Sequence, residues 1–314
     1  LFELKYFAYY VNRLHEQNSV EIEHLNEIFT ILDPNKSGVV NFYIYDTYDR
    51  ELARLRKEEK NEENYLAISH REEIVREQLS IELRPYAERL EKAIERIAEI
   101  DLLVAKSDFH TKNNLIRPTL SDIYESTTYE QIFNIYLLSM VKNYQKIDIE
   151  LIPSPTLITG ANMSGKTMLL KTVALAQYMI QFGFYAPATS CRVSLVDAVF
   201  LSVGDSQKEE EGLSSYAAEI LKVSHIINEI EKKGKYLVLL DELARTTSPR
   251  EGAAIVDGVT TLLKEKGVMS LITTHYSSLQ AEARCLRVKG FIEERIEGEL
   301  TKENISQFID YSLT

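Results

Sequence analysis

The sequence predicts an α/β domain with a mostly parallel β-sheet, preceded by an all-α region. In the second half of the chain, apolar runs typical of strands alternate with helical patterns, in the order 155–158, 167–181, 193–199, 213–232, 237–240, 251–266 and 268–274. This alternation is typical of a parallel sheet with helices on both faces. A glycine-rich stretch separates the first strand pattern from the first helical pattern. The first 110 residues show helical periodicity and high charge instead.

The N-terminal region is predicted to be helical from its apolar spacing. Residues 1–30 carry apolar side chains at helical intervals, and turn-forming residues follow at 32–38. Residues 42–45 are a short apolar stretch that favours an extended conformation. One long, charged helix is expected from about Thr47 to Leu83, and a second from about Tyr86 to Ala105, with Pro85 between them. We therefore expect a helical core and lever domain at 1–110 and an α/β domain at 111–314.

Length and composition favour two folded domains. The chain has 314 residues, of which 45% are hydrophobic, enough to bury two cores. No run of about 18 apolar residues is present, so we expect no association with a membrane through a spanning helix. The two cysteines, Cys191 and Cys285, fit no metal-binding spacing, which favours a cytoplasmic protein with reduced thiols. Because the sequence starts at Leu1 rather than at a methionine, we expect it to be a fragment.

The charge distribution argues against tight binding to nucleic acid. The net charge is −12, and residues 1–110 contain 23 acidic but only 15 basic residues. Contacts to DNA phosphates require clustered Lys and Arg side chains. Net charge does not exclude a local basic patch. Any binding of DNA by this chain is therefore expected to be weak.

The segment from Gly160 to Thr167 fits the phosphate-binding pattern G-x-x-x-x-G-K-[ST]. Its glycines let backbone N–H groups turn inward around phosphate oxygens, while Lys166 supplies a catalytic cation and the Thr167 hydroxyl can ligate Mg²⁺. The pattern therefore predicts a site for ATP and Mg²⁺. The predicted nucleotide-binding residues of the loop and helix start are Gly160, Ala161, Asn162, Met163, Ser164, Gly165, Lys166, Thr167 and Met168.

Two carboxylates follow the strand pattern that ends at Leu240. The carboxyl ends of parallel strands meet at one edge of a sheet, so Asp241 and Glu242 are expected beside the phosphate-binding loop. Asp241 is suited to hold Mg²⁺ through water together with Thr167. Glu242 is suited to orient or deprotonate an attacking water molecule. The alternative is an acidic pair that caps the following helix.

Two further segments carry candidate residues. His275 follows the strand pattern at 268–274, where its imidazole could sense a γ-phosphate; the alternative is a structural histidine. Ser214 and Ser215 open the helical pattern at 213–232, and hydroxyls at a helix N-terminus form an anion site. On its own, this serine pair is more typical of an ordinary helix cap.

Together these segments resemble the ATPase domain of the MutS family, within the ABC class of P-loop ATPases. The resemblance covers roughly residues 100–290. It rests on the loop 160–167, the stretch 183–188, Ser214-Ser215-Tyr216 with Glu219, and the segments 241–248 and 273–276, with 100–105 and Arg117-Pro118 upstream. The loop 160–167 is similar to the family's Walker A loop, and Ser214-Ser215-Tyr216 with Glu219 is similar to its signature helix. The segment 241–248 is similar to its Walker B strand with D-loop, and 273–276 to its switch-histidine segment. Ser164 and Thr246 depart from the family pattern, which usually has glycine at both places.

The resemblance implies ATP hydrolysis that moves the lever domain. It also implies a homodimer, or a pair with a MutS-like partner chain, in which Ser214 and Ser215 of one subunit complete the nucleotide site of the other. The adenine-stacking residue is expected at Asn143-Tyr144. The few residues between the two long helices leave no room for the family's DNA clamp at that point.

Three alternatives for the client stay open. The family resemblance implies DNA, in mismatch repair or recombination. The stretch 42–46 and an arm without a clamp are instead features similar to those of MutS-related ATPases associated with B12-dependent lysine and ornithine aminomutases. The client of such an ATPase would be an enzyme. The third alternative is the MutS subfamily that lacks mismatch-reading domains, which the stretch 167–172 resembles. The sequence alone does not choose among them.

Overall fold

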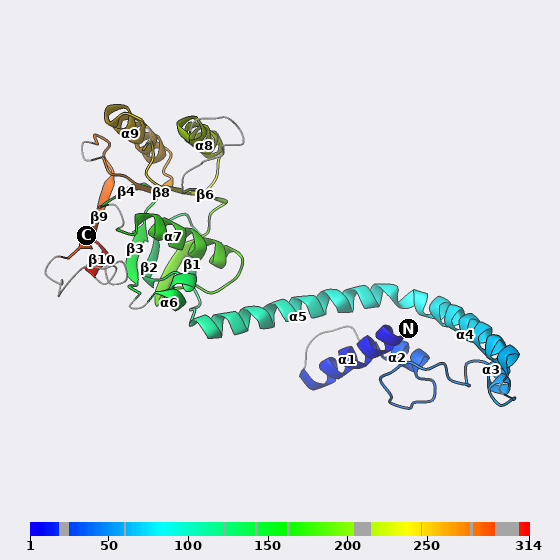
Figure 1. Cartoon of the computed structure of the whole chain (residues 1–314). Coiled ribbons are helices and arrows are strands. Elements are labelled where there is room, and N and C mark those ends of the chain that lie inside the picture. Colours follow the sequence, from blue (N-terminus) through cyan, green and yellow to red (C-terminus); the bar gives the residue numbers. More distant parts are fainter. Residues whose placement is uncertain are drawn as a thin grey trace. The chain divides into compact units, whose positions relative to one another are not determined.

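A computed structural model describes residues 1–18, 25–59, 61–121, 123–141, 144–161, 164–203, 215–245, 247–276, 279–292 and 308–314. The chain divides into two compact units, Leu1–Ser107 and Asp108–Thr314. Over its described residues the first unit is helical and the second is α/β (Figure 1). The roles expected for them, as lever and as ATPase, stay predictions. None of the described helices is long and apolar enough to cross a membrane.

The helical unit is built from short and long helices in sequence. They are α1 (Phe2–Asn18), α2 (Asn26–Leu32), α3 (Arg50–Leu55), α4 (Glu62–Leu83), the 3₁₀ turn η1 (Arg84–Tyr86) and α5 (Ala87–Asn113), whose residues after Ser107 belong to the second unit. The single helix expected from Thr47 to Leu83 is wrong, because the chain turns between α3 and α4. Asn61 begins α4 as its N-cap, accepting a 2.8 Å hydrogen bond from the Asn64 N–H. Only the three residues of η1 separate α4 from α5.

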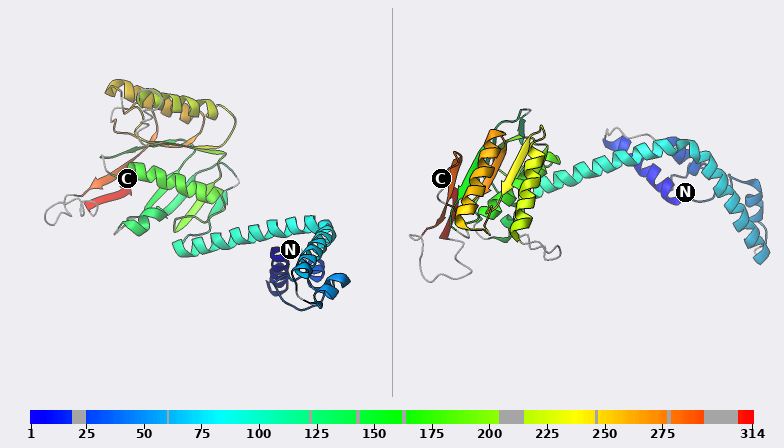
Figure 2. Two further views of the ribbon diagram at one scale, coloured as in Figure 1. Left: turned by 45° about the vertical axis from the view of Figure 1, so that its right-hand side comes forward. Right: turned by 90° about the horizontal axis from the view of Figure 1, so that it is seen from above.

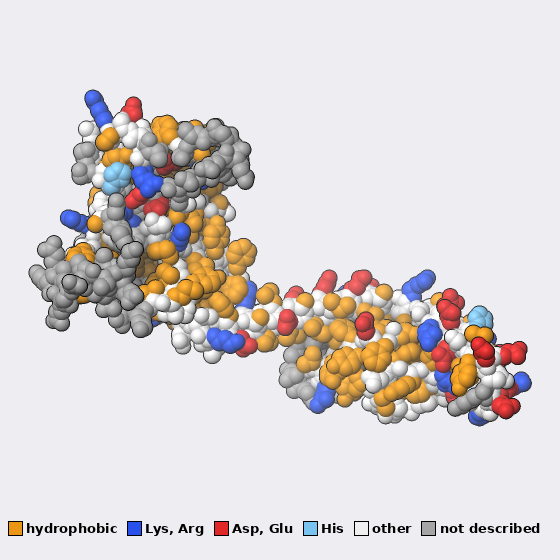
Figure 3. Space-filling model, viewed as in Figure 1, with side chains coloured by type: hydrophobic (Ala, Val, Ile, Leu, Met, Phe, Trp, Pro, Cys, Tyr) orange, Lys and Arg blue, Asp and Glu red, His pale blue; other side chains and the backbone are white. Residues whose placement is uncertain are grey.

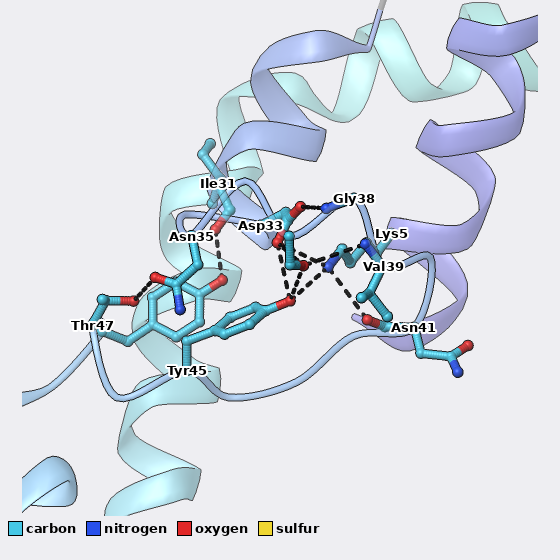
Figure 4. A network of polar contacts seen from close by, with 11 residues as sticks. Lys5, Ile31, Asp33, Asn35, Gly38, Val39, Asn41, Tyr45 and Thr47 are labelled. Carbon is cyan, nitrogen blue, oxygen red and sulfur yellow. Dashed lines mark hydrogen bonds and ion pairs between the residues drawn. The ribbon is translucent and has the colours of Figure 1, made fainter.

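A buried ion pair fixes α1 to the loop that follows α2 (Figure 4). Lys5 and Asp33 are both buried, and Lys5 Nζ lies 3.5 Å from Asp33 Oδ1. The Lys5 ammonium also donates to the Tyr45 hydroxyl at 3.1 Å and to the Asn41 carbonyl at 3.3 Å. Because both charges have partners, the pair is compatible with burial. It packs beside an apolar cluster of Ala8, Val11, Leu25, Ile28, Leu32, Leu83 and Ala93.

The second unit contains a six-stranded, mostly parallel sheet, as the sequence predicted. Its strands are β4 (Pro155–Thr159), β6 (Ala198–Ser202), β7 (Tyr236–Leu240), β8 (Met269–Thr273), β9 (Arg284–Phe291) and β10 (Ile309–Leu313). They lie in the order β10-β9-β4-β8-β7-β6, and only β10 runs antiparallel to its neighbour. The long helices are α7 (Lys166–Gln181), α8 (Ser215–Ile230) and α9 (Pro249–Glu265).

The sheet is covered on both faces (Figure 1, Figure 2). Successive side chains of a strand point to opposite faces, and β7 illustrates the division. Leu237 and Leu239 pack in the cluster that contains α7, whereas Val238 and Leu240 pack in the cluster that contains α8 and α9. The apolar run of β7 is therefore continuous because both of its faces are buried.

A smaller sheet lies with α7 on the first of these faces, and the sequence did not predict it. It contains β1 (Thr119–Ser121), β2 (Thr127–Ile132), β3 (Ile147–Leu151) and β5 (Ser190–Ser194), in the order β1-β5-β2-β3, and α6 (Ile135–Met140) connects β2 to β3. Only β1 and β5 are parallel. The single strand expected at 193–199 is wrong, because β5 belongs to this sheet and β6 to the larger one.

Candidate functional site

The candidate site begins in the loop between β4 and α7. Gly160 and Gly165 have φ angles of 148° and 85°, in a region that other residues rarely adopt. Gly165 is the N-cap of α7. A Cβ atom on Gly165 would lie 2.8 Å from the ring of Tyr311, so the neighbouring ring also requires glycine there. Asn162 and Met163 lie outside the described residues.

Lys166, the first residue of α7, is buried and turned toward this loop. Its Nζ donates to the carbonyl oxygens of Gly160 at 2.9 Å and Ala161 at 3.0 Å. The Ser164 hydroxyl in the same loop is also buried and has no hydrogen-bond partner among the described residues. Buried hydroxyl groups are normally paired. A hydroxyl and an ammonium held in a glycine-rich loop are suited to an anion.

Short hydrogen bonds join the first turn of α7 to the ends of β7 and β8. Thr167 Oγ1 donates to Asp241 Oδ2 at 2.7 Å, and Thr273 Oγ1 donates to Asp241 Oδ1 at 2.7 Å. Thr273 ends β8, which lies between β4 and β7 in the sheet. The structure therefore brings Thr167 and Asp241 together, as the strand-end argument expects. It adds Thr273, which was not among the predicted site residues because threonine is common in strands.

Glu242 follows Asp241 in an uncommon backbone conformation. Its φ angle is 46°, and its N–H donates to Thr273 Oγ1 at 2.8 Å. Its carboxylate is partly exposed and lies 3.7 Å from Arg245 Nη1. Left-handed residues other than glycine are enriched at functional sites. Glu242 thus stands at the same sheet edge as Asp241, with a carboxylate that water can reach.

His275 lies just beyond the end of β8. The preceding Thr274 N–H donates to the Ile158 carbonyl of β4 at 3.0 Å, which places this segment at the edge where the loop begins. The His275 side chain is exposed, and its ring centroid is 4.3 Å from that of Tyr276. The exposed imidazole is available to a ligand. Its role as a γ-phosphate sensor stays a prediction.

The other predicted residues are placed less directly. Met168 lies half-buried in the first turn of α7. Ser214 lies outside the described residues, as does the side chain of Ser215, the first residue of α8. Asn143 is also outside them, whereas the Tyr144 hydroxyl accepts the Asn134 N–H at 2.9 Å and its ring packs against an apolar cluster. The role of Tyr144 in adenine stacking stays a prediction.

A metal ion at this site would depend on ligands besides protein side chains. No group of three or more His, Cys, Asp or Glu side chains able to hold a metal occurs in the part of the chain that is described. The Thr167 hydroxyl and the Asp241 carboxylate supply two oxygens close together. Mg²⁺ usually keeps several waters and binds through one or two carboxylates and the phosphates of a nucleotide. The donor set therefore fits Mg²⁺ bound with a nucleotide.

Comparison with known proteins gives consistent matches. Residues 156–306 match the family described as MutS domain V. The chain is 33% identical over 225 residues to Endonuclease MutS2 of Ligilactobacillus salivarius, covering 68% of this chain and 27% of that protein. It is 30% identical over 257 residues to the Thermus thermophilus MutS2, covering 81% of this chain and 32% of that protein. It is 35% identical over 204 residues to the Fusobacterium nucleatum MutS2, covering 65% of this chain and 25% of that protein. The matches span only about a quarter to a third of these relatives.

Proposed function

We propose that this chain binds and hydrolyses ATP as an ABC-type P-loop ATPase of the MutS family. The match to MutS domain V and the MutS2 relatives support the family. The observation that carries the proposal is the contact between Thr167 and Asp241 beside a glycine-rich loop, because it joins a hydroxyl at the end of that loop to a carboxylate at the end of another parallel strand of the same sheet. Ligands in such sheets bind at the carboxyl ends of the strands.

The loop residues supply the contacts for phosphate. When a triphosphate binds, the Lys166 ammonium would donate to β- and γ-phosphate oxygens in place of the two loop carbonyls. The buried ammonium therefore has hydrogen-bond acceptors with and without the nucleotide. The Ser164 hydroxyl gains the partner that it lacks among the described residues. Gly160 and Gly165 leave the backbone close to the ligand, where a side chain would not fit. The residues present therefore fit a bound triphosphate.

Hydrolysis depends on the residues at the ends of β7 and β8. Thr167 and, through water, Asp241 would hold Mg²⁺, and Thr273 keeps the Asp241 carboxylate in place. Mg²⁺ bound there neutralises charge on the phosphates during phosphoryl transfer. Glu242 orients the attacking water and takes its proton, and His275 responds to the γ-phosphate. A second subunit completes the site with its Ser214 and Ser215, as the family resemblance implies.

The client is a separate part of the proposal. The three relatives named above all carry the name MutS2, which favours a client of the DNA-processing kind over an aminomutase. On the face of the helical unit in Figure 3, Lys and Arg side chains are interspersed with Asp and Glu rather than gathered in one basic patch. We therefore propose weak, non-specific DNA contact by this chain, lost near physiological salt. Binding to DNA measured beside binding to a B12-dependent aminomutase would separate the two alternatives.

Two substitutions test the ATPase proposal. Lys166→Ala is expected to abolish nucleotide binding or nearly so, because it removes the buried cation of the loop. Lys171→Ala, which changes an exposed lysine of the same helix, is the matched control and is expected to bind normally. Glu242→Gln is expected to retain ATP but to lose hydrolysis by about 10²-fold or more, since a general base contributes on that order. Parental turnover by Glu242→Gln would contradict the proposed role of Glu242.

A further inference from the structure

The backbone of Ala244, two residues after Glu242, is held from two directions. The Ala244 N–H donates to Glu219 Oε1 at 2.9 Å, and the Ala244 carbonyl accepts from the Tyr276 hydroxyl at 2.8 Å. Glu219 belongs to α8, whereas Tyr276 follows β8. Ala244 is completely buried. Two elements distant in the sequence therefore converge on one residue of the turn that carries Glu242.

This turn needs external support because its backbone is unusual. Glu242 has a φ angle of 46° and Ala244 one of 61°, so two non-glycine residues within three positions are left-handed. Such conformations persist when the surroundings fix them. Within the turn, the Arg245 N–H donates to the Glu242 carbonyl at a longer 3.2 Å. The shorter bonds come from outside: Thr273 Oγ1 accepts the Glu242 N–H, and Glu219 accepts the Ala244 N–H.

The hydrogen bond from the Tyr276 hydroxyl to the Ala244 carbonyl is held in place by close packing around Tyr276. Tyr276 is buried, and a Cβ atom built on Gly252 of α9 would lie 2.0 Å from its hydroxyl. Burial, followed by the nearby Glu219 carboxylate, raises the pKa of the Tyr276 phenol. The phenol therefore stays protonated at neutral pH and keeps its proton for the Ala244 carbonyl. On the other side of Ala244, the Glu219 carboxylate belongs to α8, so any displacement of α8 would change the position of this acceptor.

We propose that Glu219 is a positioning residue that fixes the orientation of Glu242 through Ala244 and so couples α8 to the hydrolytic step. The inference rests on the proposed ATPase function. α8 starts at Ser215, four residues before Glu219, which corresponds to about 6 Å along the helix. A displacement of α8 by a second subunit at its N-terminus reaches the Glu242 turn through this one hydrogen bond.

The test compares three substitutions in the full chain. Glu219→Ala removes the acceptor, and we expect the single-turnover rate of hydrolysis to fall about tenfold to a hundredfold, the usual effect of losing a hydrogen bond to a charged group. ATP affinity is expected to stay within about twofold. Glu219→Gln keeps an acceptor oxygen and is expected to remain within about threefold of the parent rate. Glu229→Ala, which changes a glutamate that pairs with Lys232 near the other end of α8, is the matched control and is expected to leave the rate unchanged.

A double substitution separates positioning from general destabilisation. If Glu219 acts through Glu242, adding Glu219→Ala to Glu242→Gln causes no further loss, because residues that act as a unit are not additive. Parental hydrolysis by Glu219→Ala, or losses that multiply in the double variant, would overturn the inference while leaving the proposed function intact. A parent chain without hydrolysis, or a fully active Glu242→Gln, would instead overturn the proposed function and the inference with it.

Discussion

The Thr167 hydroxyl donates to Asp241 Oδ2 at 2.7 Å, so one hydrogen bond joins the first turn of α7 to the end of β7. The other oxygen of the same carboxylate accepts from Thr273 at 2.7 Å. Both oxygens of Asp241 are therefore oriented by hydroxyl groups before any ion binds. Partners of this kind fix a metal ligand in the geometry that it needs.

Thr167→Ala is expected to raise the Mg²⁺ concentration that nucleotide binding requires, because it removes both the proposed metal-ligating oxygen and a donor to Asp241. We expect the Mg²⁺ concentration required for half-maximal ATP binding to rise about tenfold, within the effect known for such partners. Thr167→Ser keeps the hydroxyl and is expected to behave like the parent. Titration of Mg²⁺ at fixed ATP is the measurement. An unchanged titration of Thr167→Ala would show that Thr167 is not a ligand.

Three strands of the larger sheet, β4, β7 and β8, could be predicted from the sequence because they are buried on both faces. The run Tyr236–Leu240 is continuous and apolar, and a helical pattern follows it before the next strand. From that order, the strand-end rule was enough to place Asp241 near Thr167. The geometry of the loop itself follows from its two glycines.

Other parts could not be predicted because they depend on pairing between distant segments. β2 is short and mostly polar, β3 is short and alternates between apolar and polar residues, and β5 pairs with β2 from more than fifty positions away. The contact between Glu219 and Ala244 is likewise visible only in three dimensions. The break between α3 and α4 had a local signal in Asn61, an N-cap residue, which the charged helical pattern around it obscured.

Lys5→Met is expected to destabilise the helical unit, because it leaves the buried Asp33 carboxylate without its cation. Breaking a buried ion pair typically costs about 3–5 kcal/mol. We expect faster hydrogen exchange in α1, which Lys5 anchors to the loop after α2. Lys57→Met, at an exposed position in the same unit, is the control and is expected to leave exchange in α1 unchanged. Equal protection of α1 in both variants would show that the pair contributes little.

The stability of the helical unit is expected to fall in acid because of Asp33. Burial opposes ionisation of this carboxyl, but hydrogen bonds from Ser37, the Gly38 N–H and Tyr45 outweigh it and lower its pKa from 3.8 to about 2. A group whose pKa is lowered on folding stabilises the protein above its unfolded pKa, and the contribution is lost as the pH falls through the folded pKa. About 2 kcal/mol should therefore disappear between pH 4 and pH 2. Urea unfolding at several pH values checks this, and Asp33→Asn is expected to flatten that part of the curve.

Two glycines of α9 form a matched pair for substitution. A Cβ atom on Gly258 would meet nothing within 4 Å, whereas one on Gly252 would lie 2.0 Å from the Tyr276 hydroxyl. Gly258→Ala is therefore expected to stabilise the protein by about 0.5–1 kcal/mol through helix propensity. Gly252→Ala is expected to destabilise it by about 1–3 kcal/mol, as overpacking does, and to slow hydrolysis by displacing Tyr276 from Ala244. The thermal unfolding midpoints of the two variants test this prediction. Equal midpoints would contradict the predicted clash between a Cβ atom at position 252 and the Tyr276 hydroxyl.

Assembly of two chains around ATP is the last prediction. One phosphate-binding loop leaves the far side of the γ-phosphate open to water, and Ser214 and Ser215, which open a helical pattern in the sequence, offer donors that could close it in a second subunit. We therefore expect ATP with Mg²⁺ to drive Glu242→Gln into dimers, because this variant cannot hydrolyse the nucleotide and separate again. Adding Ser214→Arg is expected to abolish the dimer while leaving ATP binding by each chain intact, since Ser214 is predicted to serve the site of the second subunit rather than that of its own chain. Sedimentation at saturating ATP measures both. A strict monomer whose rate of hydrolysis per chain is independent of protein concentration would rule out a site shared between two subunits.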